Sequence, residues 1–201
     1  MHQTYTYLAL GDSYTIGESV DLYENFPYQT VQLLRKQGYN FTAPEIIART
    51  GWSTDELDKC IRNYRLLPRY DFVSLLIGVN NQFRGRAAEE YKEEMEGLIK
   101  FAMNMTNDKN RHVIVLSIPD YSTTPFALTL DPVKVAKDIE IFNNVNRALS
   151  IQYKIQYLPA TLNLKKEHDL DFLADDQLHP SAKEYENWAE KLSSLIIAEL
   201  K

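Results

Sequence analysis

Five short apolar segments alternate with longer amphipathic ones along the chain, and this alternation limits the possible folds more than any other feature. The apolar segments are residues 6–10, 45–48, 72–77, 112–118 and 155–158. Strands that alternate with helices build βαβ units around a parallel sheet. The sequence therefore predicts an α/β fold with a five-stranded parallel sheet.

Five longer segments have the patterns of helices. We place these helices at about residues 27–37, 53–66, 87–105, 132–152 and 181–200. Ser53 and Glu56 have the spacing of a capping box, which satisfies free backbone amides at the start of a helix. Pro27 and Pro132 suit a first helical turn, where no amide donor is needed. A chain of 201 residues can bury one substantial core, so we expect a single domain spanning residues 1–201.

Composition and charge exclude several classes of partner. The net charge is -6 and the basic residues are scattered, so the chain lacks the basic patch that binds nucleic acids or anionic membranes. No apolar run reaches the ~18 residues that span a bilayer. We therefore expect neither a nucleic-acid partner nor an integral membrane contact. No cluster of cysteine and histidine has the spacing of a zinc site, so we expect no metal.

The start of the chain and its single cysteine bear on the cellular compartment. The first residues lack the basic start and the long apolar core of a signal peptide. Cys60 is the only cysteine and cannot form an internal disulfide. Both observations favour the reducing cytoplasm, although a chain from which a leader had been removed would read the same. The sequence does not indicate an oligomeric state.

Polar and turn-forming residues follow three of the predicted strands. Ser13 comes after the first strand, Gly51 after the second and Asn80 after the third. In an open parallel sheet, ligands bind at the carboxyl ends of the strands. Each of these segments alone is also explained as turn chemistry, but three of them at one edge of a sheet indicate a site.

A fourth polar segment lies near the end of the chain. Asp176 and His179 are three residues apart, so one turn of chain can set the carboxylate against one imidazole nitrogen and leave the other nitrogen facing outward. This orientation suits a general base, because the acid fixes the tautomer and stabilises the imidazolium. Taken alone, the spacing is explained at least as well by a purely structural pair.

Together, the four segments contain the parts of an acyl-transfer site. Ser13 would be the nucleophile and His179 the base that activates it. The backbone amides of Ser13 and Gly51 and the side-chain amide of Asn80 would bind the negative charge that develops on the carbonyl oxygen. The other three histidines are less suitable as the base. His2 is near the terminus, His112 lies at the start of a predicted strand and His168 lies in a charged run.

The order of these segments resembles that of the SGNH hydrolases, also called GDSL-type esterases and lipases. Gly-Asp-Ser comes first, a turn glycine second, Gly-x-Asn third and Asp-x-x-His last, and the match extends over the whole chain. The resemblance implies a flavodoxin-like three-layer α/β/α sandwich that needs no metal or organic cofactor. It also implies that Ser13, Gly51, Asn80 and His179 are the four signature residues, and that Asp176 completes a Ser-His-Asp triad.

Two positions depart from the pattern of this family. Tyr14 stands where the family name has leucine, and Asn81 stands where many members have aspartate. The first is a packing position that should tolerate the change. The second leaves the proposed donor Asn80 unaffected.

Aromatic residues are candidates for the walls of an acyl or leaving-group pocket. Trp52, Phe83 and Phe126 lie near the predicted site, and ordinary packing explains each of them equally well. Segments 83–86 and 119–132 are the expected specificity elements. The resemblance implies carboxylic esters or thioesters as substrates. We expect short acyl chains, for example acetyl esters, because the chain has no insertion that could cover a long apolar tail.

Alternative functions remain open from the sequence. The same triad would serve a lysophospholipase, a thioesterase or an acyltransferase that passes the acyl group to a sugar or lipid hydroxyl. A flavodoxin-like module that binds phosphate in the first loop fits less well. Asp12 would repel the phosphate, and the Asp176 and His179 pair would have no role.

Overall fold

A five-stranded sheet lies at the centre of the computed structural model, which describes residues 3–162 and 170–201. The strands are β1 (Tyr7–Gly11), β2 (Glu45–Ala48), β3 (Phe72–Leu76), β4 (Val113–Leu116) and β5 (Gln156–Leu158). All neighbouring strands are parallel, in the order β2-β1-β3-β4-β5. The predicted α/β fold is confirmed, and each strand overlaps its predicted segment.

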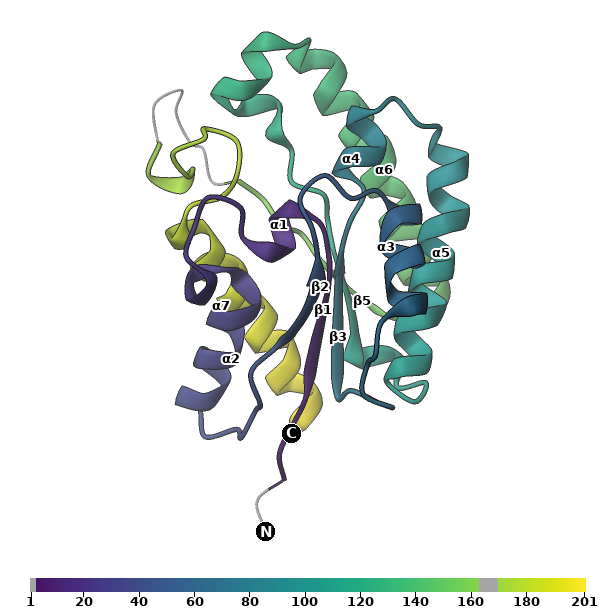
Figure 1. The fold of residues 1–201 in the computed structure, drawn as a ribbon, viewed down its shortest axis with the longest axis vertical. Helices are drawn as coiled ribbons and strands as arrows, with labels where there is room; N and C mark the ends of the chain where they lie inside the picture. The colour runs from purple at the N-terminus through teal and green to yellow at the C-terminus, as the bar shows by residue number, and fades with distance from the viewer. Residues whose placement is uncertain (1–2, 163–169) are drawn as a thin grey trace.

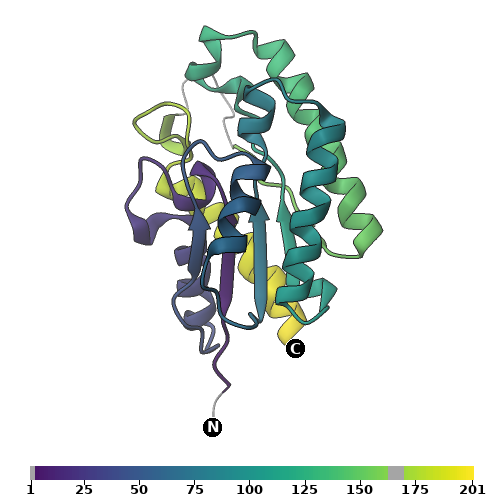
Figure 2. The same cartoon turned by 45° about the vertical axis from the view of Figure 1, so that its right-hand side comes forward.

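Helices cover both faces of the sheet. On one face, α2 (Phe26–Lys36) lies beside α7 (Ala182–Leu200), and the other face carries α3 (Thr54–Asn63), α5 (Ala88–Met105) and α6 (Pro132–Tyr153) (Figure 1). Figure 2 brings this second face forward. The arrangement is the expected three-layer sandwich. None of the helices in the described ranges combines the length and the apolar character that crossing a membrane requires.

The sequence signals at the helix starts act as predicted. Ser53 and Glu56 form both hydrogen bonds of the capping box at the start of α3. Pro27 and Pro132 occupy the first turns of α2 and α6, where a missing amide costs nothing. Helix α3 ends at Asn63, before the predicted end at residue 66.

Several short helices lie in loops where the sequence showed no helical periodicity. Two follow strands directly: α1 (Ser13–Ile16) after β1 and α4 (Val79–Phe83) after β3. The others are 3₁₀ turns: η1 (Leu22–Glu24), η2 (Asn110–His112), η3 (Tyr121–Thr123), η4 (Pro125–Thr129) and η5 (Leu170–Phe172). Single turns of four or five residues are too short for a period of 3.6 to show.

Gly11 allows the end of β1 to pack directly against α1 and β3. A Cβ atom at this position would lie 2.1 Å from Oγ1 of Thr15 and 2.2 Å from the carbonyl oxygen of Leu76. Both distances are far below van der Waals contact. The glycine of Gly-Asp-Ser is therefore required by close packing, and it places Ser13 immediately above the carboxyl end of β1.

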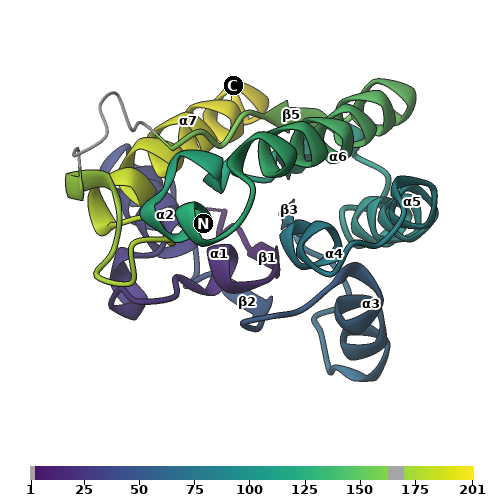
Figure 3. The same ribbon diagram turned by 90° about the horizontal axis from the view of Figure 1, so that it is seen from above.

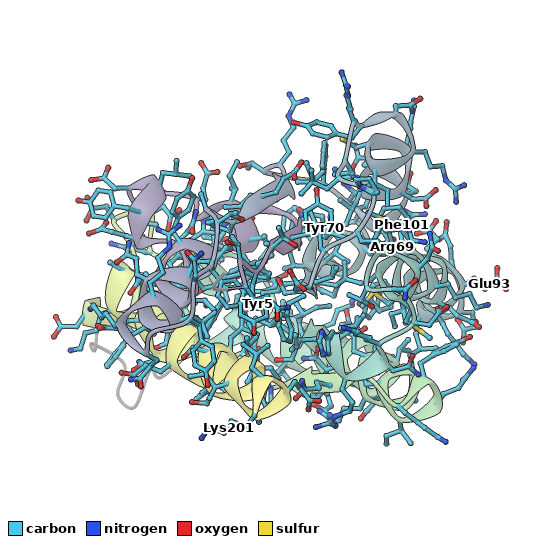
Figure 4. All side chains as sticks on the ribbon, turned by 90° about the horizontal axis from the view of Figure 1, so that it is seen from below. Tyr5, Arg69, Tyr70, Glu93, Phe101 and Lys201 are labelled. Carbon is cyan, nitrogen blue, oxygen red and sulfur yellow. The ribbon has the colours of Figure 1, made fainter. Side chains whose placement is uncertain are left out.

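Aromatic side chains close the opposite end of the sheet, where the strands begin. Figure 4 views this end, with Tyr5 and Tyr70 labelled. Tyr5 stacks on Phe41 with ring centroids 5.1 Å apart, and the buried Tyr70 hydrogen-bonds to Glu45. The first contact joins the segments that precede β1 and β2, and the second joins β2 to the segment that precedes β3.

Candidate active site

The predicted site residues come together at the carboxyl ends of the strands. Figure 3 looks onto this end of the sheet, where α1 and α4 lie above β1 and β3. A cavity of about 190 Å³ opens here. It is lined by residues from five separate segments of the chain: Ser13, Tyr14, Thr50, Gly51, Val79, Asn80, Phe83, Tyr121, Phe126, Leu178 and His179.

Ser13 is held at the start of the short helix α1. Asp12 caps this helix, because its Oδ1 accepts a hydrogen bond of 3.0 Å from the amide of Tyr14. The Ser13 side chain faces the cavity with only 5% of its surface exposed. Its Oγ lies 2.9 Å from Nε2 of His179, which comes from the loop before α7.

His179 is oriented by Asp176. Its Nδ1 lies 2.6 Å from Oδ2 of Asp176, and the other carboxylate oxygen, Oδ1, accepts hydrogen bonds from the amides of Leu178 at 3.0 Å and His179 at 2.9 Å. Ser19 also donates from its hydroxyl to Oδ2 of Asp176, at 2.8 Å. With Nδ1 donating to the acid, Nε2 is left to accept the proton of the Ser13 hydroxyl.

These hydrogen bonds keep the Asp176 carboxylate charged. Partial burial acts to raise the pKa of Asp176, but the hydrogen bonds from the His179 side chain and from the amides of His179 and Leu178 outweigh it. The pKa falls to about 2. The acid is therefore ionised throughout the neutral range and can stabilise an imidazolium at position 179.

Gly51 and Asn80 border the same cavity as Ser13. Gly51 has φ of +84°, a left-handed conformation that glycine adopts without steric cost. In the described part of the chain, the amides of Ser13 and Gly51 donate no hydrogen bond to another residue. Nδ2 of Asn80 donates to the carbonyl of Trp52 at 3.0 Å, and the second hydrogen of that amide group remains available. Three residues that each have an available donor thus line one cavity.

The sequence itself identifies the group of proteins to which this chain is related. The sequence profile of the GDSL-like lipase/acylhydrolase family matches residues 9–186. The chain belongs to this family. It is therefore a serine hydrolase that acts on carboxylic ester bonds. This assignment favours the esterase hypothesis over the phosphate-binding alternative.

Solved structures with the same fold include a lipase and two esterases. The lipase Lip_vut3 from a goat rumen metagenome is 20% identical, with a TM-score of 0.74 over 95% of this chain and 97% of that one. Axe2, an acetylxylan esterase from Geobacillus stearothermophilus, is 16% identical, with a TM-score of 0.74 over 96% and 94%. The psychrotrophic esterase EstA from Pseudoalteromonas sp. is 15% identical, with a TM-score of 0.71 over 98% of each chain. No curated protein matches the sequence.

Asn81, which departs from the common family pattern, has a structural role next to Asn80. It is fully buried, and its Oδ1 accepts a hydrogen bond of 3.1 Å from the amide of Thr54. Its Nδ2 donates to the Thr54 hydroxyl at 2.6 Å. These bonds hold α4 against the start of α3. Asn81, which follows the proposed oxyanion donor Asn80, therefore fixes the position of α4.

The arginines of segment 83–86 bind neighbouring loops instead of lining the cavity. Arg84 donates to the carbonyl of Gly51 at 2.7 Å and pairs with Glu56 at 2.9 Å. Arg86 pairs with Asp55 of α3 and with two glutamates of α5, Glu90 at 2.5 Å and Glu94 at 2.7 Å. Only Phe83 of this predicted specificity segment reaches the cavity.

The predicted aromatic wall is present in part. Phe83 and Phe126 line the cavity, with ring centroids 6.4 Å apart. Trp52 does not line it, and its half-buried side chain packs against the hydrophobic core. Tyr121 lines the cavity instead and donates its hydroxyl to Gln82 at 2.8 Å. The loop 119–132 had the right composition for a wall, but nothing in the sequence distinguished Tyr121 from its neighbours.

Within the described ranges, the remaining histidines and the acidic residues do not form a second candidate site. His112 bonds through Nδ1 to the carbonyl of Asp71 at 2.6 Å, and its ring stacks on Phe72 at 4.3 Å. His2 and His168 lie outside the described residues. Within residues 3–162 and 170–201, no group of three histidine, cysteine or acidic side chains is arranged to hold a metal ion.

Asp12 is a buried ionisable group that directly precedes Ser13 in the chain. It is fully inaccessible to solvent, and its Oδ2 has no hydrogen-bond partner among the described residues. Burial raises the pKa of Asp12 to about 7, against the opposing effect of the hydrogen bond from the Tyr14 amide. Below about pH 7 the folded protein therefore favours the neutral acid, whereas the same carboxyl in the unfolded chain has a pKa of about 3.9.

We expect Asp12→Asn to stabilise the fold increasingly as the pH rises from about 4 to about 7. In this window the native protein binds more protons than the unfolded chain, so its free energy of unfolding falls with pH. Asparagine keeps an acceptor for the Tyr14 amide and carries no titrating proton. The advantage of the variant should grow by about 1.4 kcal/mol per pH unit. Urea unfolding of both proteins across this window measures it, and a constant difference would contradict the raised pKa.

Proposed function

We propose that the protein hydrolyses carboxylic esters of short acyl chains, such as acetyl esters, through an acyl-enzyme on Ser13. The observation that carries this proposal is the continuous series of hydrogen bonds from Ser13 through His179 to Asp176, with distances of 2.9 Å and 2.6 Å. The series ends at the wall of a cavity that Gly51 and Asn80 also line.

The proposed reaction begins with proton transfer from Ser13. Nε2 of His179 takes the proton of the Ser13 hydroxyl as Oγ attacks the acyl carbonyl carbon. The imidazolium that forms is stabilised by the ionised Asp176. His179 then gives the proton to the leaving alcohol, the carbon–oxygen bond to that alcohol breaks, and the acyl group stays on Ser13. Water repeats the sequence and releases the acid.

The negative charge of the tetrahedral intermediate falls on the former carbonyl oxygen. The amides of Ser13 and Gly51 and the side chain of Asn80 would donate to this oxygen. All three border the cavity. Preformed donors of this kind contribute about 3 kcal/mol each to the stability of the transition state. Arg84 and Asn80 hold the carbonyls of Gly51 and Trp52, so the loop that carries the Gly51 donor is restrained before substrate binds.

The size and lining of the cavity support a short acyl chain. At about 190 Å³ it is smaller than the ~300–1,000 Å³ pockets that hold drug-sized ligands. Val79, Phe83, Phe126 and Leu178 give it largely apolar walls. The similar structure of Axe2, which is named an acetylxylan esterase, is consistent with an acetyl substrate. A rate profile over aryl esters of two to about twelve carbons measures this preference, and an optimum at long chains would contradict it.

Covalent labelling tests the proposed nucleophile directly. A fluorophosphonate should add once per chain and only to Ser13, since a hydroxyl reacts with it when a base removes the proton. EstA was solved in a form inhibited by monoethylphosphonate, which makes this class of probe suitable. Intact-mass measurement should show one adduct on the wild type and none on Ser13→Ala. Ser122→Ala is the matched control, because Ser122 lies in η3 and does not line the cavity, and this variant should be labelled as the wild type is. Absence of labelling of the wild type, or an adduct on another residue, would overturn the proposal.

A further inference from the structure

Ser19 has an unusual backbone conformation for its residue type. Its φ is +66°, in the left-handed region that side-chain-bearing residues seldom adopt. Its side chain is exposed, and it lies in the loop between α1 and η1. Strained residues of this kind gather at functional sites, where surrounding contacts hold them. The question is what Ser19 contacts.

The Ser19 hydroxyl donates to the acid of the triad. The bond to Oδ2 of Asp176 is 2.8 Å long and joins residues that are 157 positions apart in the chain. The same oxygen receives Nδ1 of His179, while Oδ1 receives two backbone amides. A carboxylate has about four acceptor sites. Ser19 therefore completes the set of donors around Asp176.

The loop that carries Ser19 also contacts the second segment of the site. The carboxylate of Glu18 accepts a hydrogen bond from the hydroxyl of Thr50, which lines the cavity beside Gly51. Neighbouring residues of one loop thus reach the acid of the triad on one side and the predicted oxyanion loop on the other. The loop links three segments of the site.

We propose that Ser19 is a positioning residue that holds the Asp176 carboxylate in the plane that His179 requires. The inference rests on the proposed function of the triad. The side chain of Asp176 is 31% exposed, so without the Ser19 bond one of its oxygens is open to water and the carboxylate can turn. Rotation of the acid misdirects the imidazole and weakens proton removal from Ser13. The left-handed backbone at position 19 sets the direction of the hydroxyl.

Two substitutions separate positioning from a merely structural role. Ser19→Gly removes the hydroxyl and suits the left-handed backbone, so kcat should fall by about 10-fold with KM unchanged and the melting temperature the same or higher. Ser19→Thr keeps the hydroxyl but adds a β-branch that this backbone disfavours. It should lower the melting temperature and keep kcat within about 3-fold of the wild type. Ser19→Thr should therefore have the higher kcat of the two variants, and Ser19→Gly should have the higher melting temperature.

The matched control is a substitution to glycine at a second residue with a left-handed backbone, outside the site. Asn107 has φ of +56° in the loop after α5, and Asn107→Gly should leave both kcat and KM unchanged. An unchanged kcat in Ser19→Gly, or an equal loss in Ser19→Gly and Ser19→Thr, would overturn the inference.

A readout that needs no substrate separates this inference from the proposed function. The low-field proton resonance of His179 Nδ1–H reports the bond to Asp176, and it should shift or broaden in Ser19→Gly and stay in place in Ser19→Thr. If the wild type neither hydrolyses esters nor reacts with the fluorophosphonate, the proposed reaction is wrong. The His179 resonance still tests the role of Ser19 in that case. A resonance unaffected by Ser19→Gly would refute the positioning role whatever the activity.

Discussion

Ser13→Ala is expected to lower kcat for a small aryl acetate by about 10⁴- to 10⁶-fold, the loss that follows when a nucleophile of this type is removed. Oγ of Ser13 is the atom that would bond to the acyl carbon, and in this structure it is hydrogen-bonded to His179. Without it, water must attack the ester directly, aided only by binding and the remaining donors. Steady-state kinetics on the purified variant measure the loss.

The fold should survive Ser13→Ala. The cap of α1 comes from Asp12 and not from Ser13, and the lost hydroxyl makes one hydrogen bond at the wall of an open cavity. The free energy of unfolding should change by less than about 1.5 kcal/mol. A variant that keeps more than about 1% of the wild-type kcat while folding normally would exclude Ser13 as the nucleophile.

Asp176→Asn is expected to lower kcat by about 10³- to 10⁴-fold, the second largest effect. The introduced carbonyl oxygen would take the place of Oδ1, which accepts the amides of Leu178 and His179. The introduced amide nitrogen would then face Nδ1 of His179, and two donors cannot share a hydrogen bond. The histidine must move its proton to Nε2, where it can no longer accept the proton of Ser13.

The neighbouring acid provides the matched control. Asp175 is exposed and does not line the cavity, so Asp175→Asn should leave kcat within about 2-fold of the wild type. Fluorophosphonate labelling should slow in Asp176→Asn by a factor similar to the loss in kcat, because both depend on the activated hydroxyl. Equal activity in the two variants would show that the carboxylate at 176 has no part in the reaction.

Local patterns predicted most of the fold. The strand segments could be read because parallel strands are buried on both faces and need continuous apolar residues, as in β1 and β3. The starts of α3 and α6 could be read because capping depends on residues within one turn. The Asp176 and His179 contact is also local, since the two residues are three positions apart.

Side-chain direction could not be read in the same way. Trp52 and Phe126 are both aromatic and both pack against the hydrophobic core, yet only Phe126 also lines the cavity. The arginines after Phe83 lie in a predicted specificity segment, but they bind the loop that carries Gly51 and the first turn of α3, which carries Asp55. The difference lies in the path of the backbone, which a pattern of residue types does not record.

The sequence by itself determined the alternation of elements, the four polar segments and the family, because each depends on residue type and spacing along the chain. Only the tertiary structure decided that Ser13 and His179, 166 positions apart, meet at 2.9 Å, and that Ser19 reaches Asp176. Such contacts depend on the order and register of the strands and on how loops fold over the end of the sheet. These are properties of the whole packed core, and no single segment of the chain contains them.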